Sequence, residues 1–328
     1  MQDEERSHLD QPTPSLPPQE RIGLSIIATD AADAVNRIVE AEQAGLRQIW
    51  LSQGGSGGAD TLTIAAMAAI RTTQIRLGTA IVPIYPRHPI VMAQQALAIH
   101  DLAPGRLRLG IGPSHRPIIQ GSYGLPMPSP LSYLQEYSTV LRGLLGQGQV
   151  EHHGTFFEIK AASRTAPIPL LVSALGKRAF QVAGEISDGA ISWVCPVPYL
   201  LNEALPSLQA GAAEQGRPVP PLVAHVVVAL STDEAAVHTQ ACQFLLRYSK
   251  LPFYAQMFAS AGLPVAADGT GLEELARVLV ISGDEARLRQ RLGELLAQGL
   301  SELMIHPLPM TNTGKERSQL LQVLANLA

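Results

Sequence analysis

The sequence predicts a single (β/α)8 barrel, and three observations support that fold class. Along residues 21–328, short apolar segments alternate with helical ones, and eight of the apolar segments have the composition of parallel strands. The G-x-G-x-x-G fingerprint of an open dinucleotide-binding sheet does not follow the first of them. The chain has 328 residues and is 46% hydrophobic, which allows a large core, and α/β barrels of this length form one domain.

Each expected strand is a short run rich in β-branched and aliphatic residues. The first is followed by a helix that Asp30 caps and Gly45 ends, and the second by an Ala-rich helix at residues 59–70. Later helices are expected at residues 177–186 and 199–215. The eight strands are expected at residues 22–27, 48–52, 75–82, 106–111, 169–174, 189–193, 222–230 and 302–306.

Residues 75–116 form the clearest strand–helix–strand unit. A buried strand is followed by a turn that three prolines stiffen, and then by a helix at residues 90–100. Pro104 and Gly105 end that helix, and the next strand runs into Gly110-Ile111-Gly112. Such a unit implies a parallel sheet with helices outside it.

Two long segments interrupt the alternation. Residues 113–168 are expected to hold a helix at 132–145 and a hairpin at 152–159, with Gly154 in its turn. An insertion of this size between barrel units usually serves the active-site face. Residues 250–275, before the eighth strand, are rich in Gly and Pro and predict a second irregular excursion.

Two helices are expected to begin with a capping box, in which a Ser side chain and a Glu three residues later satisfy each other's backbone N–H groups. Ser231 with Glu234 precedes one helix, and Ser282 with Glu285 precedes another. The second helix has leucines at helical spacing, and Gly299 ends it.

Composition and charge exclude several classes of protein. Residues 1–20 are polar and proline-rich, so they are expected to be a disordered tail. The net charge is −4 and no basic run occurs, which makes nucleic acid an improbable partner. The absence of a secretory signal and of a long apolar run predicts a soluble cytoplasmic protein. Cys195 and Cys242 match no metal spacing, and two buried thiols are the favoured interpretation.

In a barrel of this kind, the active site lies at the carboxyl ends of the strands. The residues that follow the expected strands are therefore the candidate site. They are Ser52 and Gln53; Thr79, Ala80, Ile81, Val82 and Pro83; Gly112, Pro113, Ser114 and His115; Ala174, Leu175, Gly176, Lys177 and Arg178; Trp193; and His306.

His115 is the candidate for acid–base chemistry. A histidine donates or accepts a proton near neutral pH, and this one ends the fourth strand. The alternative, a histidine that only forms a hydrogen bond within its loop, is about equally compatible with the sequence.

The segment from Ala174 to Arg178 is a candidate anion site. A helix is expected to begin here, where free N–H groups and two cationic side chains could hold a phosphate. The alternative is a capped helix with two solvated charges, which the spacing alone slightly favours.

Other motifs favour simpler interpretations. The glycine-rich loop at residues 54–58 lacks the Lys-Ser/Thr ending of a phosphate-binding P-loop. His152 and His153 have no third ligand at a suitable spacing, so no metal site is expected. No G-x-S-x-G elbow or paired-carboxylate arrangement occurs.

Several short motifs, in this order, resemble the bacterial luciferase-like superfamily of flavin and deazaflavin oxidoreductases, and most of all the branch that uses coenzyme F420. The resemblance covers residues 22–307. It is carried by Glu42-Gln43-Ala44-Gly45-Leu46 with Ile49-Trp50, Ile75-Arg76-Leu77-Gly78-Thr79 with Arg87-His88-Pro89, Gly105-Arg106-Leu107 with Leu109-Gly110-Ile111-Gly112, Ala174-Leu175-Gly176, and Ala183-Gly184-Glu185 with Asp188-Gly189.

The resemblance implies a barrel with a flavin or deazaflavin ring in its mouth. It implies a non-prolyl cis peptide behind that ring, at the bond Ala80–Ile81. It also places the cofactor's phosphate tail at residues 175–178, where the sequence indicates an anion site. Relatives are commonly dimers, so a homodimer is expected.

Two departures from the family pattern concern the substrate. Deazaflavin relatives often carry Asp-His after the second strand, where this chain has Gln53-Gly54. Several carry a glutamate after the fourth strand, where this chain has His115. Sugar-phosphate and pterin substrates therefore cannot be transferred to this chain.

The hypothesis is an oxidoreductase in which a hydride passes between coenzyme F420 and an unsaturated or carbonyl-type small molecule, with His115 as proton donor or orienter. Ser52, Gln53, residues 79–81, residues 112–114 and residues 174–178 are expected to bind the cofactor. An FMN-dependent monooxygenase that uses reduced flavin and oxygen is one alternative. A flavin-binding barrel without catalytic activity is the other.

Overall fold

The computed structural model describes residues 16–53, 55, 57–310 and 313–327, and its centre is a closed barrel of eight parallel strands. The strands pair in the order β10–β12–β1–β2–β3–β5–β8–β9, and β9 pairs with β10 to close the ring. The barrel strands are β1 (Ile22–Ile27), β2 (Gln48–Ser52), β3 (Arg76–Thr79), β5 (Leu107–Gly112), β8 (Leu170–Ser173), β9 (Gly189–Ile191), β10 (Leu222–Leu230) and β12 (Glu302–Pro307). The predicted fold class is confirmed.

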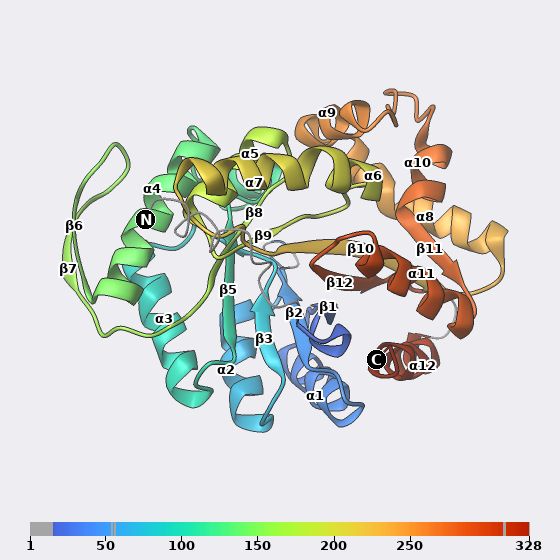
Figure 1. Cartoon of the computed structure of the whole chain (residues 1–328), viewed down its shortest axis with the longest axis horizontal. Helices are drawn as coiled ribbons and strands as arrows, with labels where there is room; N and C mark the ends of the chain where they lie inside the picture. The colour runs from blue at the N-terminus through green and yellow to red at the C-terminus, as the bar shows by residue number, and fades with distance from the viewer. Residues whose placement is uncertain (1–15, 54, 56, 311–312, 328) are drawn as a thin grey trace, which may run out of the picture.

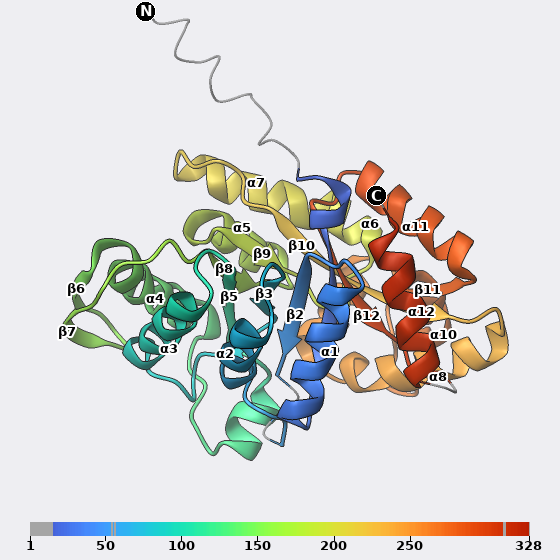
Figure 2. The ribbon, with the colours of Figure 1, turned by 90° about the horizontal axis from the view of Figure 1, so that it is seen from below.

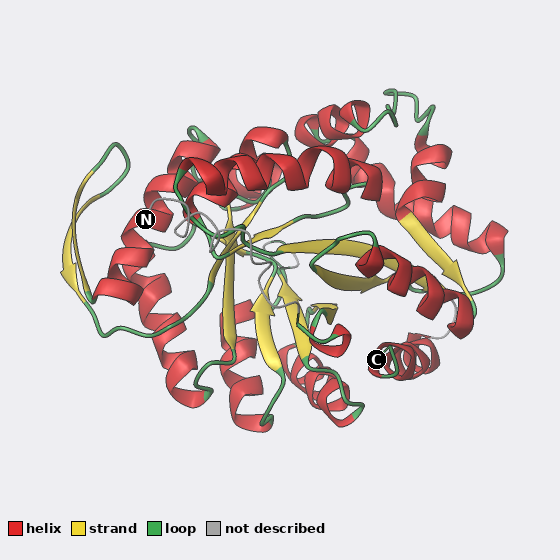
Figure 3. Ribbon diagram, viewed as in Figure 1, coloured by secondary structure: helices red, strands yellow, loops and turns green. Residues whose placement is uncertain are grey.

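Helices surround the strands, as Figures 1 and 3 show. The α-helices are α1 (Ala31–Gln43), α2 (Thr61–Arg71), α3 (Pro89–Leu102), α4 (Pro130–Arg142), α5 (Lys177–Ile186), α6 (Val197–Tyr199), α7 (Leu205–Glu214), α8 (Glu234–Ser249), α9 (Pro252–Ser260), α10 (Leu272–Leu279), α11 (Glu285–Ala297) and α12 (Thr313–Ala325). Shorter turns are the 3-10 helix η2 (Pro18–Glu20) and the π-helical η3 (Pro117–Ser122), η4 (Gly143–Gln147) and η5 (Leu200–Ala204).

The insertion after β5 contains the expected helix and hairpin. The hairpin consists of β6 (Gln149–His153) and β7 (Glu158–Ala162), which pair antiparallel around Gly154. Glu136 of α4 fixes its turn by accepting hydrogen bonds from the backbone N–H groups of residues 155–157. Both views show the hairpin beyond α4, on the opposite side of the molecule from α11 and α12 (Figures 1 and 2).

The expected strand at residues 75–82 is interrupted. β3 ends at Thr79, and the two-residue strand β4 (Val82–Pro83) resumes the pairing with β5. At the break, the Thr79 hydroxyl donates a hydrogen bond to the Gly110 carbonyl and accepts one from the Gly110 N–H, both at 2.8 Å. A side chain thus replaces the backbone pairing at the break.

The prediction of an irregular segment at 250–275 is wrong over much of its length. Pro252 starts α9, and its buried residues Tyr254, Met257 and Phe258 share one face at helical spacing. The helix α10 follows at Leu272, and it leads into β11 (Val280–Gly283), an unpredicted strand that pairs with β10 outside the ring. Gly and Pro mark the helix boundaries here, and they do not make the whole segment irregular.

The two predicted capping boxes are also wrong. The caps are Asp233 and Asp284, whose carboxylates accept the N–H of Ala236 at 3.0 Å and of Arg287 at 2.9 Å. An aspartate two residues nearer to each helix supplies the acceptor, so the serines stay outside the helices.

Two smaller expectations fall partly outside the described residues. Residues 1–15 of the predicted tail are among those not described, whereas residues 18–20 form η2, and Arg76 donates a hydrogen bond to the Glu20 carbonyl. Both cysteines are free thiols; Cys195 is buried as predicted, whereas Cys242 is partly exposed. None of the helices in the described part of the chain combines the length and apolar character that a bilayer span requires.

The amino-terminal end of the barrel interior is closed by Gln48, Arg108 and Glu302, which we call the paired layer. Arg108 donates to both carboxylate oxygens of Glu302, at 2.6 and 2.8 Å, and to the Gln48 side-chain oxygen. Gln48 in turn donates to Glu302 at 3.0 Å. Trp50 fills the next level, where only a glycine fits at position 78, because a Cβ there would lie 2.3 Å from the indole.

Candidate functional site

The break between β3 and β4 lies at the carboxyl end of the barrel, where the resemblance implies a ring-binding wall. The peptide bond Ala80–Ile81 is cis, as the resemblance implies. Ala80 is buried, and Ile81 is half-buried. The Thr79 side chain is fully buried and both of its hydrogen bonds go to Gly110, so this residue contributes to the site by shaping the wall.

The loop after β5 carries His115 to the mouth of the barrel. Ser114 has a φ of +61°, in the left-handed region, which few residues other than glycine adopt. The His115 ring packs against Tyr254 of α9, with the ring centroids 5.6 Å apart. Burial, and then the nearby Arg247 guanidinium, lower the pKa of His115, so its imidazole is neutral near pH 7.

The two candidates after β2 are held within the barrel end. Ser52 is buried, and its hydroxyl lies 3.4 Å from that of Ser25. Gln53 donates to the Gly55 carbonyl at 3.3 Å, while its side-chain oxygen is buried without a hydrogen-bond partner. Gly54, which follows Gln53 where deazaflavin relatives often carry Asp-His, is outside the described residues.

The helix α5 begins beside the same barrel end, at the predicted anion site. Gly176 is its N-cap and offers no side-chain hydrogen bond, and the space where a Cβ would project is open. Tyr199 holds the preceding turn by donating to the Leu175 carbonyl at 3.1 Å. The first N–H groups of α5 are therefore available to an anion.

The two cationic side chains at this helix start have partners already. Lys177 forms an ion pair with Glu203, and Arg178 pairs with Glu185 at 3.1 Å. Both cations are largely exposed. At this position the backbone, more than the side chains, is suited to hold a phosphate.

A cluster of aromatic rings, of which the strand-end rule predicts two members, lies at the mouth. We call it the mouth cluster; it consists of Trp193, His225, Phe244, Tyr248, Tyr254 and His306. Trp193 and His306 follow from the strand-end rule, but His225 does not, because it lies in the middle of β10. In the sequence, His225 is distinguished only as the single ionisable residue of the otherwise apolar segment Leu222–Leu230.

The rings of the mouth cluster contact one another closely. Trp193 lies 3.8 Å from His225 by ring centroids, and His306 lies 5.1 Å from His225. The Trp193 Nε1–H donates to the Tyr248 hydroxyl at 2.8 Å, which fixes the indole. Arg247 stacks over Phe244 and Tyr248, at 4.8 Å from each ring.

The two histidines of the cluster are buried and neutral. His225 is 3% exposed, and burial, followed by His306 and Arg247, lowers its pKa well below the usual value. His306 is 9% exposed, and burial, followed by Arg247 and Arg37, lowers its pKa to about 4. Burial disfavours the charged imidazolium, and the cations add to that effect.

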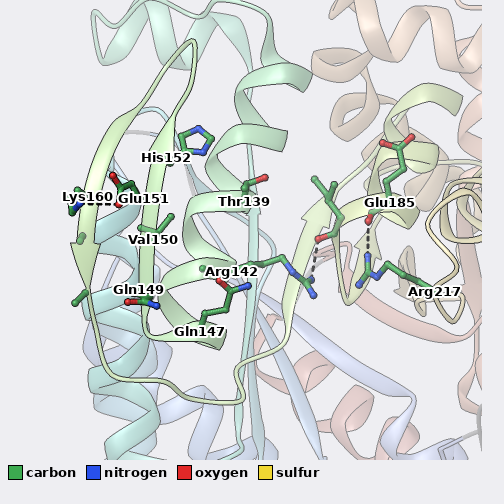
Figure 4. Close-up of a pocket in the computed structure, with 14 residues that line it drawn as sticks. Thr139, Arg142, Gln147, Gln149, Val150, Glu151, His152, Lys160, Glu185 and Arg217 are labelled. Atoms are coloured by element: carbon green, nitrogen blue, oxygen red, sulfur yellow. Dashed lines mark hydrogen bonds and ion pairs between the residues drawn. The ribbon is translucent and has the colours of Figure 1, made fainter.

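One hollow of the described structure lies away from the barrel mouth. It occupies about 910 Å³ between the hairpin, α4 and the end of α5, and none of the predicted site residues lines it (Figure 4). Its two arginines are used by the carboxyl end of α5: Arg142 donates to the Ile186 carbonyl, and Arg217 to that of Glu185. Across the described residues, no three His, Cys, Asp or Glu side chains are placed to hold a metal ion.

Comparisons with known proteins agree with this barrel. The sequence model of the luciferase-like monooxygenase family matches residues 9–301. The chain is 28% identical to the F420-dependent glucose-6-phosphate dehydrogenase of Beutenbergia cavernae, over 87% of this chain and 91% of that protein. It is 27% identical to the 5,10-methylenetetrahydromethanopterin reductase of Methanolobus tindarius, over 54% of each.

A solved structure shares the fold over nearly the whole chain. It is an F420-dependent secondary alcohol dehydrogenase in complex with an F420–acetone adduct, which superposes with a TM-score of 0.78. The alignment covers 93% of this chain and 98% of the other, at 18% identity.

Proposed function

The chain belongs to the luciferase-like monooxygenase family of enzymes, and from this premise we propose that it is an oxidoreductase that transfers a hydride between coenzyme F420 and a small organic substrate. The glucose-6-phosphate dehydrogenase and the secondary alcohol dehydrogenase to which the chain is similar are both F420-dependent, whereas a Baeyer–Villiger monooxygenase that shares the fold contains FMN. The observation that carries the proposal within this chain is the neutral imidazole of His115, held at the strand end where barrels of this type place their chemistry.

The residues at the barrel mouth fit the cofactor in two places. Ala80, Ile81 and Gly112 would form the wall for the ring, and the open N-terminus of α5 from Gly176 would hold the phosphate tail. Coenzyme F420, when bound, supplies the carbon that carries the hydride.

In this proposal, His115 holds or transfers the proton that accompanies hydride transfer. Its lowered pKa keeps it neutral, so one ring nitrogen accepts a hydrogen bond while the other donates one. Tyr254 packs against the ring and fixes its orientation, and α9 helps to exclude water.

Fluorescence titration of the purified protein with F420 and with FMN tests the cofactor. We expect saturable binding of F420 and weaker binding of FMN. Tighter binding of FMN, together with oxygen-dependent turnover, would establish the alternative of a flavin-dependent monooxygenase.

Replacement of His115 tests the mechanism. We expect His115→Ala to lower turnover about 10²- to 10⁴-fold while the affinity for F420 changes little, because a positioned acid–base group contributes about that much. His238→Ala, which removes a histidine from α8 outside the mouth cluster, is the matched control and should keep its activity. Unchanged turnover in His115→Ala would remove this residue from the mechanism.

We also propose that the protein forms a homodimer through α2 and α3. Large apolar side chains lie exposed on these adjacent helices, with Ile70 69% and Leu102 46% accessible. Light scattering should show that Ile70→Glu weakens the dimer, whereas Val278→Glu on α10 does not. A monomeric wild-type protein would contradict this assembly.

A further inference from the structure

His225 presents a buried hydrogen-bond donor that nothing in the protein uses. The Val194 N–H donates to its Nδ1 at 3.3 Å, so the proton of the neutral ring lies on Nε2. Nε2 is buried and has no hydrogen-bond partner. An unpaired buried N–H is costly to a fold, and native structures rarely keep one without a reason.

The surrounding backbone is shaped to hold this tautomer. Val194 has a φ of +53°, which is unfavourable for a β-branched residue, and this conformation directs its N–H to His225. The backbone N–H of His225 donates to the Ser192 hydroxyl at 3.2 Å, which anchors β10 to the end of β9. Val194 thus orients the ring, and Ser192 holds the backbone that carries it.

His306 adds a second buried nitrogen without a partner, its Nδ1. It lies on the neighbouring strand β12, with its ring centroid 5.1 Å from that of His225. The charges that act on the pair are cationic. Arg247 of α8 acts on both rings, and Arg37 of α1, which pairs with Asp33 at 3.7 Å, acts on His306.

Aromatic side chains make further contacts around His225 and His306. Trp193, Phe244 and Tyr248 contact the two histidines or each other, while Tyr254 joins Tyr248 to His115. Burial raises the pKa of Tyr248 and of Tyr254, so both phenols stay neutral at physiological pH. The rings that surround the two histidines are therefore uncharged, and Arg247 and Arg37 supply positive charge nearby.

We propose that His225 and His306 hold the carboxylate of a small organic acid, with the His225 Nε2–H as its first donor. A carboxylate oxygen would satisfy the unpaired N–H, and Arg247 would stabilise its charge. The aromatic rings suit a planar, unsaturated body for such an acid. The inference rests on the proposed function only in identifying this acid as the substrate.

Two consequences follow from the geometry. The Trp193 indole packs on the His225 ring, with the centroids 3.8 Å apart, so we expect the indole and the rings of α8 to move when a ligand reaches Nε2. An anion beside neutral imidazoles favours their protonation, so binding should take up protons and should strengthen as the pH falls.

Benzoate and its neutral isostere benzamide are the probes that test this proposal on the full-length protein without cofactor. Trp193 reports binding by its fluorescence, in a Trp50→Phe background that removes the other tryptophan. We expect benzoate to bind about tenfold or more tightly than benzamide, and its affinity to rise between pH 8 and pH 6. Isothermal titration in two buffers of different ionisation enthalpy would count the protons.

Variants of the pair separate binding from structure. His225→Phe should abolish the preference for benzoate, whereas His225→Gln, which keeps a side-chain N–H donor, should retain binding but lose part of its pH dependence. His238→Gln is the matched control and should behave as the wild type. Equal affinity for benzoate and benzamide, absence of binding, or a full preference for benzoate in His225→Phe would overturn the proposal.

The same samples distinguish this inference from the proposed function. Benzoate binding without F420 binding would support the carboxylate site and contradict the F420-dependent oxidoreductase. The reverse result would keep the oxidoreductase and remove the carboxylate site.

Discussion

The two ends of the barrel interior hold buried polar groups in opposite conditions. In the paired layer, Arg108 and Glu302 are bridged by two hydrogen bonds and Gln48 joins them, and none of the buried side-chain atoms that lack a partner belongs to these three residues. In the mouth cluster, His225 and His306 each keep a buried nitrogen without one. The first arrangement closes the fold, and the second leaves hydrogen-bonding capacity for a ligand.

The difference matches the position of each group along the strands. Gln48 and Glu302 are the first residues of their strands, whereas His306 is near the end of β12. In barrels of this kind the amino-terminal face serves stability and the carboxyl-terminal face serves chemistry. Substitutions at the two ends should therefore have separable effects on stability and on binding.

The largest expected effect is on stability, in the paired layer. Arg108→Met leaves the Glu302 carboxylate buried and unpaired, which should lower the free energy of unfolding by about 3–5 kcal/mol in urea denaturation. The double variant Arg108→Met/Glu302→Leu should recover much of the loss because it removes the orphaned charge. A cost below about 1 kcal/mol in the single variant would show that water enters this layer.

Acid should destabilise the fold through His306 of the mouth cluster. The pKa of His306 is lowered to about 4 from 6.5, so the unfolded chain binds more protons than the folded one between those values. Stability is therefore complete above about pH 6.5 and decreases as the pH falls towards 4, by about 3 kcal/mol from this group. Denaturation curves between pH 7 and pH 4 should show this slope, and His306→Gln should flatten it.

Thr79 is a buried polar residue at the carboxyl end of the barrel whose hydroxyl, unlike the two histidines, has hydrogen-bond partners. Thr79→Val removes the hydroxyl that serves both the N–H and the carbonyl of Gly110, at a cost of about 1–3 kcal/mol in unfolding. Thr72→Val, which removes a hydroxyl that donates to the Ala68 carbonyl on α2, offers a comparison away from the site. F420 affinity that falls in Thr79→Val alone would show that the wall it shapes contributes to the site.

The smallest expected effect concerns the fixed indole of the mouth cluster. Tyr248→Phe removes the acceptor of the Trp193 Nε1–H, which should cost about 0.5–1.5 kcal/mol of stability. The freed indole should also change its fluorescence in the Trp50→Phe background. An unchanged emission spectrum would indicate that packing, and not the hydrogen bond, holds Trp193.

The sequence was most informative where a local signal decided the structure. The strands 22–27, 48–52 and 222–230 and the helix 177–186 have the predicted bounds, because apolar runs between turn residues leave few alternatives. The helix α9 was missed because a short helix between glycines and prolines has a weak periodic signal. The cap at Asp233 was missed because the sequence offers two acceptors two residues apart, and only the path of the backbone selects one.

The sequence by itself determined the barrel, the strand ends that meet at its mouth, and the positions of His115, Trp193 and His306. Only the tertiary structure decided that His225, in the middle of a strand, joins them with an unused N–H, and that Lys177 and Arg178 already have carboxylate partners. The physical reason is that the period and composition of a strand follow from neighbouring residues. The partners of a polar atom depend instead on groups that are far apart in the chain, and only the closed barrel brings them within hydrogen-bond distance.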